Sequence, residues 1–307
     1  MADPRLEVRK TYKLYVGGKF PRSESGRSYE VTGAGGAFLA NAAQASRKDA
    51  RDAVVAARKA FPGWAGATAY NRGQVLYRVA ELLEGRRAQF VAEVADARAA
   101  AAAEGASVDP KAARDAGQSR VDAEAQVDAA IDRWVWYAGW ADKIAQVAGS
   151  SNAVAGPYFN FSVPEPTGVV AVLAPQTSGL LGLVSVVAPV IVSGNAAVVV
   201  AAERLPLPAV TLTEVLATSD LPGGVINLLT GRTAELAPVL AAHMDVNAID
   251  LCGAPADQVT DLERGAADNV KRVMRPAGDS EDWTADPDPQ RILAFTELKT
   301  VWHPVGV

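Results

Sequence analysis

The stretch that decides the fold is GVVAVLAPQTSGLLGLVSVVAPVIVSGNAAVVVAA, residues 168–202. It contains three apolar runs, which are interrupted at APQTSG and again at SGN. A membrane-spanning helix needs about 20 apolar residues without a break. We therefore interpret the runs as a buried strand, a buried helix and a second buried strand. Strands that are apolar along their whole length are typical of a parallel sheet with helices on both faces.

The same alternation continues beyond this stretch. PAVTLTEVLATS predicts a helix, GVINLLTG a strand, TAELAPVLAAH a helix and VNAIDLCG another strand. Strands that alternate with short helices indicate an α/β fold, so we expect an open, doubly wound parallel sheet over about residues 165–275. The dinucleotide fingerprint G-x-G-x-x-G is absent. Its nearest approach, Gly33-Ala34-Gly35-Gly36, follows no buried strand, and we interpret it as a turn.

The residues before this domain predict a hairpin followed by helices. Residues 12–32 have the pattern of an antiparallel hairpin with a turn at Gly17-Gly18. Ser46 is a suitable N-cap for a helix that runs to Phe61. Two more helical segments follow over residues 71–103.

A long aromatic helix is predicted next. The helical pattern fades between Gly105 and Gly117, where we expect a mobile insertion, and it resumes at Val121. This helix carries large aromatic residues at helical spacing, which usually belong to the core: Trp134, Trp136, Tyr137 and Trp140.

Composition excludes several classes of protein. The chain has 307 residues, of which 49% are hydrophobic and 21% charged, so it is neither disordered nor a disulfide scaffold. Its net charge of −5 gives no basic footprint for nucleic acid. One cysteine, Cys252, and two histidines, His243 and His303, leave no histidine cluster or thiolate metal site. We find no signal peptide, and we expect a cytoplasmic protein without a membrane partner.

Several ordered segments carry a family resemblance. YVGGKF (15–20), WYAGWADKI (136–144), VPEPTGVVAVLAP (163–175), LPGGVINLLTG (221–231) and TELKTVW (296–302) resemble the aldehyde dehydrogenase superfamily. The resemblance covers most of residues 12–276 and about 291–302. It implies a Rossmann-like doubly wound parallel sheet with N-terminal helices and a protruding antiparallel oligomerisation sheet. Members are usually NAD(P)-dependent and use a cysteine nucleophile.

The resemblance also implies a truncated member that lacks the catalytic domain. Pro276 stands where the family motif L-E-L-G-G supplies the general-base glutamate, and the segments that would hold the nucleophilic cysteine do not follow. We therefore expect no catalytic residue. The implied parts are an N-terminal hairpin and helices (1–150), an oligomerisation hairpin (151–168), the Rossmann-like part (169–275), an acidic linker that replaces the catalytic domain (276–290), and a C-terminal oligomerisation strand (291–307).

The cofactor positions that the resemblance implies are partly altered. Pro175-Gln176-Thr177-Ser178 resembles the family's P-W-N-F, with Thr177 in place of the asparagine that stabilises the oxyanion. Val200-Ala201-Ala202-Glu203 resembles K-P-A-E, so the lysine is lost and Glu203 is kept. Gly231 is also kept, and Ala254 replaces a phosphate-seating serine. Pro175, Thr177, Glu203 and Gly231 are thus vestigial cofactor-binding residues, and we expect no binding or weak binding of NAD(P).

Some residues allow two interpretations. Glu203 is either a ribose ligand or a helix-capping or surface carboxylate before residues 204–210. Cys252 is either a thiolate activated at a helix N-terminus or a small apolar residue at a strand end. The acidic run DSEDWTADPDP, residues 279–289, is either a solvated linker or a partner-binding segment.

Two functions fit these features. The first is a catalytically incompetent subunit that assembles with a full-length aldehyde dehydrogenase paralogue as a structural or regulatory partner. Its sheet would come from residues 157–168 and 294–302. The alternative is an NAD(P)-binding oxidoreductase of the same family with residual or altered activity. Aldehyde oxidation needs a thiolate, a base and a bound nicotinamide, and we therefore favour the first function.

Overall fold

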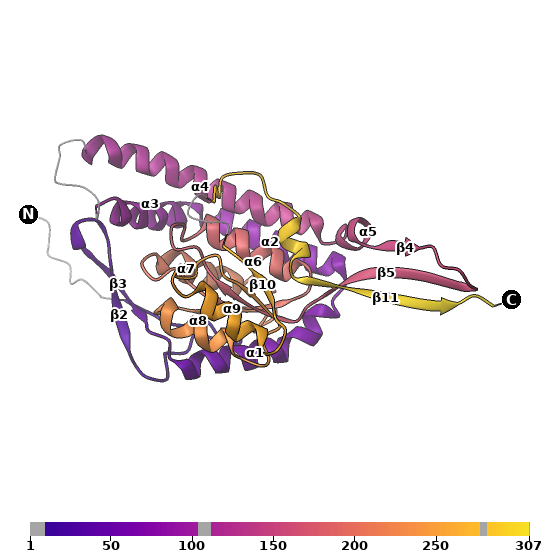
Figure 1. The fold of residues 1–307 in the computed structure, drawn as a ribbon. Coiled ribbons are helices and arrows are strands. Elements are labelled where there is room, and N and C mark those ends of the chain that lie inside the picture. Colours follow the sequence, from indigo (N-terminus) through magenta and orange to yellow (C-terminus); the bar gives the residue numbers. More distant parts are fainter. Residues whose placement is uncertain (1–9, 104–111, 277–280, 307) are drawn as a thin grey trace, which may run out of the picture.

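A computed structural model describes residues 10–103, 112–276 and 281–306. At its centre lies a five-stranded parallel sheet in the order β10-β9-β6-β7-β8 (Figure 1). Its strands are β6 (Val169–Leu173), β7 (Ala196–Val200), β8 (Ile226–Leu229), β9 (Ala248–Asp250) and β10 (Arg272–Met274). The connecting helices are α6 (Leu181–Val192), α7 (Pro206–Leu216), α8 (Thr233–Ala241) and α9 (Val259–Ala267).

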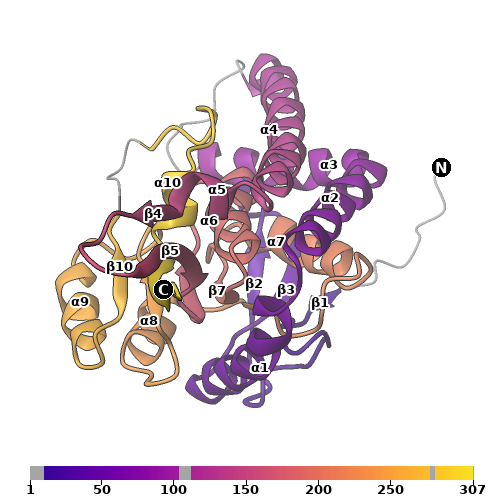
Figure 2. The same cartoon turned by 90° about the vertical axis from the view of Figure 1, so that its right-hand side faces the viewer.

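Alternate residues of the strands enter two different cores. Val170 and Val172 join a cluster with α6, whereas Val169, Ala171 and Leu173 join a second cluster with α8. Helices therefore cover both faces, as Figure 2 shows, and the predicted doubly wound α/β fold is confirmed.

The interpretation of residues 168–202 is also confirmed. The stretch forms β6, α6 and β7, and every residue of α6 is buried. A helix that is apolar all round belongs in the interior of a sheet-and-helix core. Within the described ranges, none of the helices has the length and apolarity that a membrane crossing requires.

The predicted hairpin over residues 12–32 is wrong. Strands β1 (Thr11–Tyr12) and β2 (Ser28–Thr32) both pair with β3 (Phe38–Ala43), β1 in parallel and β2 in antiparallel orientation. The turn at Gly17-Gly18 does form, because Val16 and Lys19 exchange backbone hydrogen bonds. Tyr15 instead pairs with Leu228 of β8, so this segment extends the buried sheet edge rather than a local hairpin.

The glycine run forms a turn, as predicted. Three of its four residues, Ala34–Gly36, make a short 3₁₀ turn, η1, that joins β2 to β3. Gly35 and Gly36 have φ values of 64° and 78°, a region that favours glycine.

The N-terminal helices pack on both faces of the sheet, because the first joins the core that contains α8 and the next three join the core that contains α6. They are α1 (Arg47–Ala65), α2 (Ala69–Gly85), α3 (Arg87–Ala103), α4 (Ala112–Trp140) and α5 (Ile144–Ala148). The Ser46 N-cap is confirmed, with Asp49 completing a capping box. On α4, Trp134 and Tyr137 are fully buried, and Trp136 and Trp140 pack against the same core.

The predicted insertion is shorter than expected. Residues 112–117 already belong to α4, because helix α4 begins at Ala112 rather than at Val121. The remaining residues of the predicted insertion, 105–111, lie outside the described residues.

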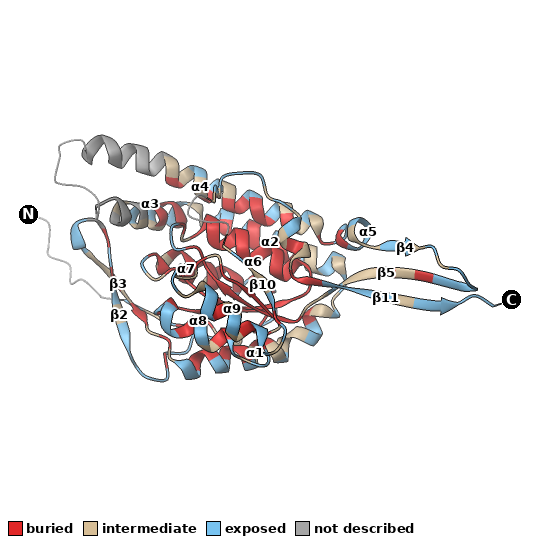
Figure 3. Ribbon diagram, viewed as in Figure 1, coloured by how far each residue is buried: buried red, intermediate tan, exposed pale blue. Residues whose placement is uncertain are grey.

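A second sheet projects from the body of the molecule (Figures 1 and 3). Its order is β11-β5-β4, with β11 (Thr296–Pro304), β5 (Tyr158–Pro166) and β4 (Ser150–Asn152). Nine residues of β11 pair with β5 in antiparallel register. The predicted protruding antiparallel sheet is confirmed as architecture, and we call it the protruding sheet.

The segment between β10 and β11, where an acidic linker is predicted over residues 276–290, ends in a helix. Residues 290–293 form a short helix, α10 (Gln290–Leu293), so the last strand begins at Thr296 rather than at residue 291. Of the predicted linker, residues 277–280 lie outside the described residues. Residues 281–293, which we call the return segment, pack on the core through Trp283 and Ile292.

Candidate nucleotide site

A cavity of about 650 Å³ lies beyond the carboxyl ends of β6, β7 and β8. Its lining comes from the residues that follow these strands (Gln176, Thr177, Glu203, Arg204, Leu205 and Arg232) and from the N-terminal strand β2 with η1 (residues 29–33, 35 and 36). Ligands of open α/β sheets bind at this edge of the strands. The volume also lies within the usual range of small-molecule pockets.

Glu203 is the acidic group of this cavity. Its Oε1 accepts a hydrogen bond of 2.6 Å from the backbone N–H of Thr233, the first residue of α8. Its Oε2 lies 3.3 Å from Arg232 Nη1. A carboxylate at a helix N-terminus is stabilised by the helix dipole. Glu203 therefore caps α8 and not α7, the helix that directly follows it in the sequence. Its side chain also lines the cavity.

Gln176 holds the neighbouring loop in place, a role that the sequence did not indicate. Its Nε2 donates to Ala174 O at 2.8 Å, and its Oε1 accepts from Glu203 N at 3.0 Å. The amide thereby links the loop after β6 to the loop after β7. Thr177, beside it, is exposed and lines the cavity, and its role as a cofactor-binding residue stays a prediction.

Pro175 and Gly231 lie outside the lining of this cavity. Pro175 is buried behind the loop, where a Cβ added at Gly182 would lie 3.1 Å from its Cγ. Gly231 has a φ of 144°, and a Cβ there would lie 3.1 Å from Ala45 N. The glycine is therefore required by the turn and by close packing, and its assignment as a cofactor contact stays a prediction.

Two buried hydroxyl groups lie in or next to the site. Thr233 Oγ1 is buried and finds no hydrogen-bond partner in the described part of the chain, whereas the buried Tyr29 Oη lies within hydrogen-bonding reach of the Gly231 backbone. The Tyr29 ring lies 5.6 Å from the Arg232 guanidinium carbon, and burial raises the pKa of Tyr29. The sequence analysis missed Tyr29, because only tertiary packing brings β2 to the ends of β7 and β8.

Cys252 does not have the surroundings of an activated thiolate. It follows β9, and the next helix, α9, begins only at Val259. Burial, together with the carboxylates of Asp250 and Glu281, raises the pKa of the Cys252 thiol. Its Sγ donates to Glu281 Oε2 at 3.5 Å. The interpretation as an activated thiolate is therefore wrong, and the residue is a half-buried thiol at a strand end.

A buried ion pair holds the return segment beside Cys252. Arg291 Nη1 lies 3.4 Å from Asp250 Oδ2, and Arg291 Nη2 contacts Glu281 Oε1. Asp250 is completely buried, and this burial raises its pKa to about 6 against the opposing effect of Arg291. The Arg291 guanidinium also lies 5.3 Å from the Trp283 ring.

Arg133 of α4 fixes the same segment from the other side. Its Nη2 donates to the carbonyl oxygens of Trp283 at 3.0 Å and Ala285 at 2.7 Å, and its Nη1 donates to Ser185 Oγ at 2.8 Å. The interpretation of the acidic run as a solvated linker is therefore wrong for Trp283 and for the carbonyl groups of Trp283 and Ala285, which contact the body of the molecule. The side chains of Asp282, Asp286 and Asp288 do point to solvent.

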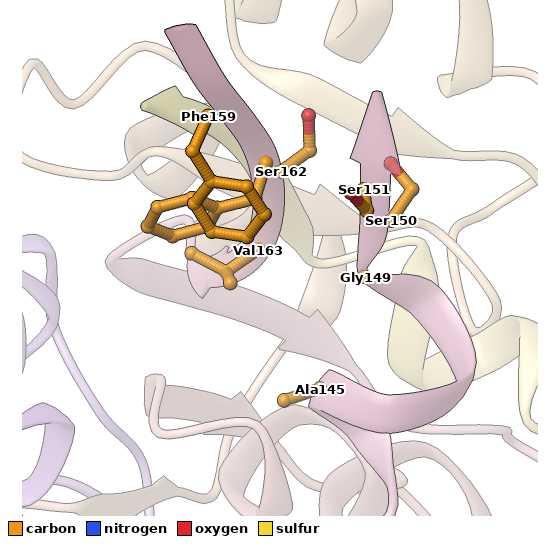
Figure 4. A pocket seen from close by; sticks show the side chains of 8 residues that line it. Ala145, Gly149, Ser150, Ser151, Phe159, Ser162 and Val163 are labelled. Atoms are coloured by element: carbon orange, nitrogen blue, oxygen red, sulfur yellow. The ribbon is translucent and has the colours of Figure 1, made fainter. Parts of the chain in front are cut away.

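The protruding sheet carries a separate hollow of about 370 Å³. In Figure 4, Phe159 and Val163 lie on one side of it, and Ser150 and Ser151 lie on the neighbouring strand. Ala145 and Gly149 complete the lining next to α5. This hollow is shallow and largely apolar, and it contains no titratable group.

The two histidines have no catalytic surroundings. His243 follows α8, its Nδ1 accepts from Asp245 N at 3.1 Å, and burial lowers its pKa. His303 is exposed on β11. Across the described ranges, no three His, Cys, Asp or Glu side chains are grouped so that they could hold a metal ion.

Comparison with known proteins agrees with this fold. A model of the aldehyde dehydrogenase family matches residues 22–279. Human retinal dehydrogenase 2 is 30% identical over 280 residues, which span 90% of this chain and 50% of that protein. An aldehyde dehydrogenase of Aspergillus niger is 29% identical over 267 residues, 86% of this chain and 50% of that protein. The chain thus spans about half the length of these curated relatives.

Solved structures of aldehyde dehydrogenases have a similar fold. An aldehyde dehydrogenase of Bacillus cereus in complex with NAD+ has a TM-score of 0.75 and 24% identity, over 87% of this chain and 50% of that one. An NAD-dependent aldehyde dehydrogenase of Sinorhizobium meliloti has a TM-score of 0.75 and 25% identity, over 89% of this chain and 51% of that one.

Proposed function

Because the chain belongs to the aldehyde dehydrogenase family, we propose that it is a subunit without aldehyde-oxidising activity of its own. It assembles with a full-length aldehyde dehydrogenase through its protruding sheet and serves as a structural or regulatory partner. The proposal places the chain in the cytoplasm, since a single free cysteine suits a reducing compartment.

The state of Cys252 carries the proposal. Aldehyde oxidation by the family's route needs a thiolate that attacks the carbonyl carbon. Cys252 is the only cysteine of the sequence, and burial with two nearby carboxylates raises its pKa. A thiol in this environment stays protonated at neutral pH and is a weak nucleophile. Pro276, in the position of the family's general base, offers no group that accepts a proton.

The surface of the protruding sheet supports assembly. Phe159 is 51% exposed, Trp302 58% and Leu298 64%, and all three lie on this sheet. Tyr158 and Val305 are also exposed next to them. Both outer strands leave one edge unpaired within the described sheet, and free strand edges favour pairing with another chain. A cluster of exposed aromatic side chains is typical of a protein interface.

Co-expression with a full-length aldehyde dehydrogenase from the same source tests the proposal. We expect a stable complex by size exclusion with mass measurement, and its loss in the double variant Phe159→Ser/Trp302→Ser. A matched control is Tyr70→Ser, an exposed aromatic residue on α2. Alone, the chain should not reduce NAD or NADP with short aldehydes. Turnover that disappears in Cys252→Ser would overturn the proposal.

A second function is supported by the cavity beside Glu203. An NAD(P)-binding oxidoreductase with residual or altered activity would use Glu203 for ribose hydroxyls and Arg232 for a phosphate group. The buried hydroxyl of Thr233, which has no hydrogen-bond partner within the described residues, favours a polar ligand or a water molecule next to this cavity. Calorimetric titration with NAD and NADP tests the binding part, and we expect weak binding, since the lysine of the family's ribose clamp is Val200 here.

A further inference from the structure

A separate cavity of about 240 Å³ lies in the N-terminal sheet. In this sheet β3 is the middle strand, with β1 on one side and β2 on the other. Ala43, the last residue of β3, belongs to the lining, and its small side chain leaves space between the end of β1 and the start of β2. This cavity shares no lining residue with the cavity beside Glu203.

Three cationic side chains line this cavity, namely Lys13, Arg22 and Arg27. All three residues are exposed, and their side chains make no ion pair or hydrogen bond within the described residues. The lining contains no acidic residue, although the whole chain has a net charge of −5. A cleft lined by one sign of charge concentrates ions of the opposite sign, so the chemistry of this cavity selects an anion.

The acidic side chains at the neighbouring turn are engaged at the start of α1. Glu24 Oε1 accepts from Ser46 Oγ at 3.0 Å, and Asp49 Oδ2 accepts from Ser46 N at 2.8 Å. Asp49 Oδ2 also accepts from Ser23 Oγ at 2.7 Å. These carboxylates therefore complete the cap of the helix and leave the charge of the cavity uncompensated.

Two backbone contacts bring the three cations to one cavity. Leu14 N–H donates to Pro21 O at 3.1 Å, and these two residues adjoin the first two cations in the sequence. Gly26 N–H closes a turn by donating to Ser23 O at 2.9 Å, and this turn returns the chain to the cavity at Arg27. Gly26 has a φ of 67°, a region that favours glycine. The arrangement is thus fixed by the backbone.

We propose that this cavity binds a small polyvalent oxyanion with the size and charge of pyrophosphate. A phosphate group carries about 1.5 to 2 negative charges at neutral pH, so two linked groups balance three cations. Arginine binds phosphate oxygens through two parallel N–H groups, and lysine acts as a point charge. The volume lies below the range of about 300–1,000 Å³ that is usual for pockets of larger organic ligands, which favours a compact anion.

The site is independent of the proposed function. The strands β2 and β3 lie at the end of the molecule opposite the protruding sheet, as Figure 1 shows. A bound anion therefore does not compete with assembly through the protruding sheet, and the result of either test leaves the other open.

Calorimetric titration of the full chain with inorganic pyrophosphate tests the proposal. We expect a dissociation constant below about 1 mM in buffer of low ionic strength. The double variant Arg22→Gln/Arg27→Gln should weaken binding at least about tenfold, because it removes two charge-assisted contacts. Both side chains are exposed and have no ion pair within the described residues, so the variant should unfold at the same urea concentration as the parent chain.

A matched pair of single variants separates the cavity from the general charge of the segment. Lys13→Gln should weaken binding by about three- to tenfold. Lys19→Gln removes the same charge from an exposed lysine of the neighbouring turn, which lies outside the lining, and should leave binding unchanged. Equal losses in these two variants, or no binding at about 10 mM pyrophosphate, would overturn the proposal. Displacement of pyrophosphate by NAD would place the anion beside Glu203 and would overturn it as well.

Discussion

The two halves of the central sheet have the same architecture and opposite surroundings. Beyond β6, β7 and β8 the chain leaves a cavity of about 650 Å³ with Glu203 and Arg232 at its wall. Beyond β9 and β10 it places Arg291, Glu281 and Trp283. Every residue of β6, β7, β8 and β9 is buried, whereas the edge strand β10 is partly exposed. The difference therefore comes from a segment that is remote in sequence, and it shows that strand topology alone does not determine whether a site is open.

The largest expected effect concerns the ion pair between Arg291 and Asp250 beyond the end of β9. Arg291→Ala leaves Asp250 buried without its cation, and removal of one partner of a buried pair costs about 3–5 kcal/mol. Urea unfolding should show this loss of stability. The matched control is Arg275→Ala, whose exposed pair with Glu263 contributes at most about 1 kcal/mol. Equal losses in the two variants would contradict the difference between the halves.

Trp283 gives the next largest effect. Trp283→Ala removes a half-buried indole from the core and should lower the free energy of unfolding by about 2 kcal/mol. Trp302→Ala, on the protruding sheet, is the control, because the side chain is 58% exposed and its loss should cost little in the isolated chain. The same urea titration measures both. A negligible effect of Trp283→Ala would contradict the packing of the return segment on the core.

The pH dependence of stability tests the burial of Asp250. Its pKa is about 6 in the folded chain and about 4 when unfolded, so the folded state binds more protons between these values. The contribution of Asp250 to the free energy of unfolding is therefore fully present below about pH 4, and it is lost as the pH rises through 6. From pH 7 to pH 5 the chain should gain about 1 kcal/mol relative to Asp250→Asn. Parallel pH profiles of the two proteins would contradict this prediction.

The stability of the chain should respond least to substitution at the cavity beyond β6, β7 and β8. Glu203→Gln removes the charge that caps α8, for which about 0.3–1 kcal/mol is expected from the helix dipole. Thermal unfolding of this variant beside Glu81→Gln, which changes a surface carboxylate on α2, measures the difference. A loss larger than about 2 kcal/mol would mean that Glu203 is primarily structural, and it would weaken the nucleotide assignment.

Elements with a local pattern could be predicted from the sequence. The runs in residues 168–202 specify β6, α6 and β7, since apolar periodicity and breaks act within a few residues. Ser46 caps α1 because its side chain reaches the backbone two and three residues ahead. The family resemblance located Glu203 and Thr177, which both line the cavity.

Long-range pairings were decided only by the tertiary structure. The sequence placed β1 and β2 in one hairpin, yet both pair with β3, because strand patterns do not encode the identity of the partner. Tyr29 reaches the cavity, and Arg291 reaches Asp250 across 41 residues. The acidic composition of residues 279–289 indicated solvent, but the buried carboxylate of Asp250 needs a cation, and Arg291 of the return segment supplies it. Local propensity is a property of neighbouring residues, whereas desolvation and charge compensation depend on which distant groups the folded chain brings together.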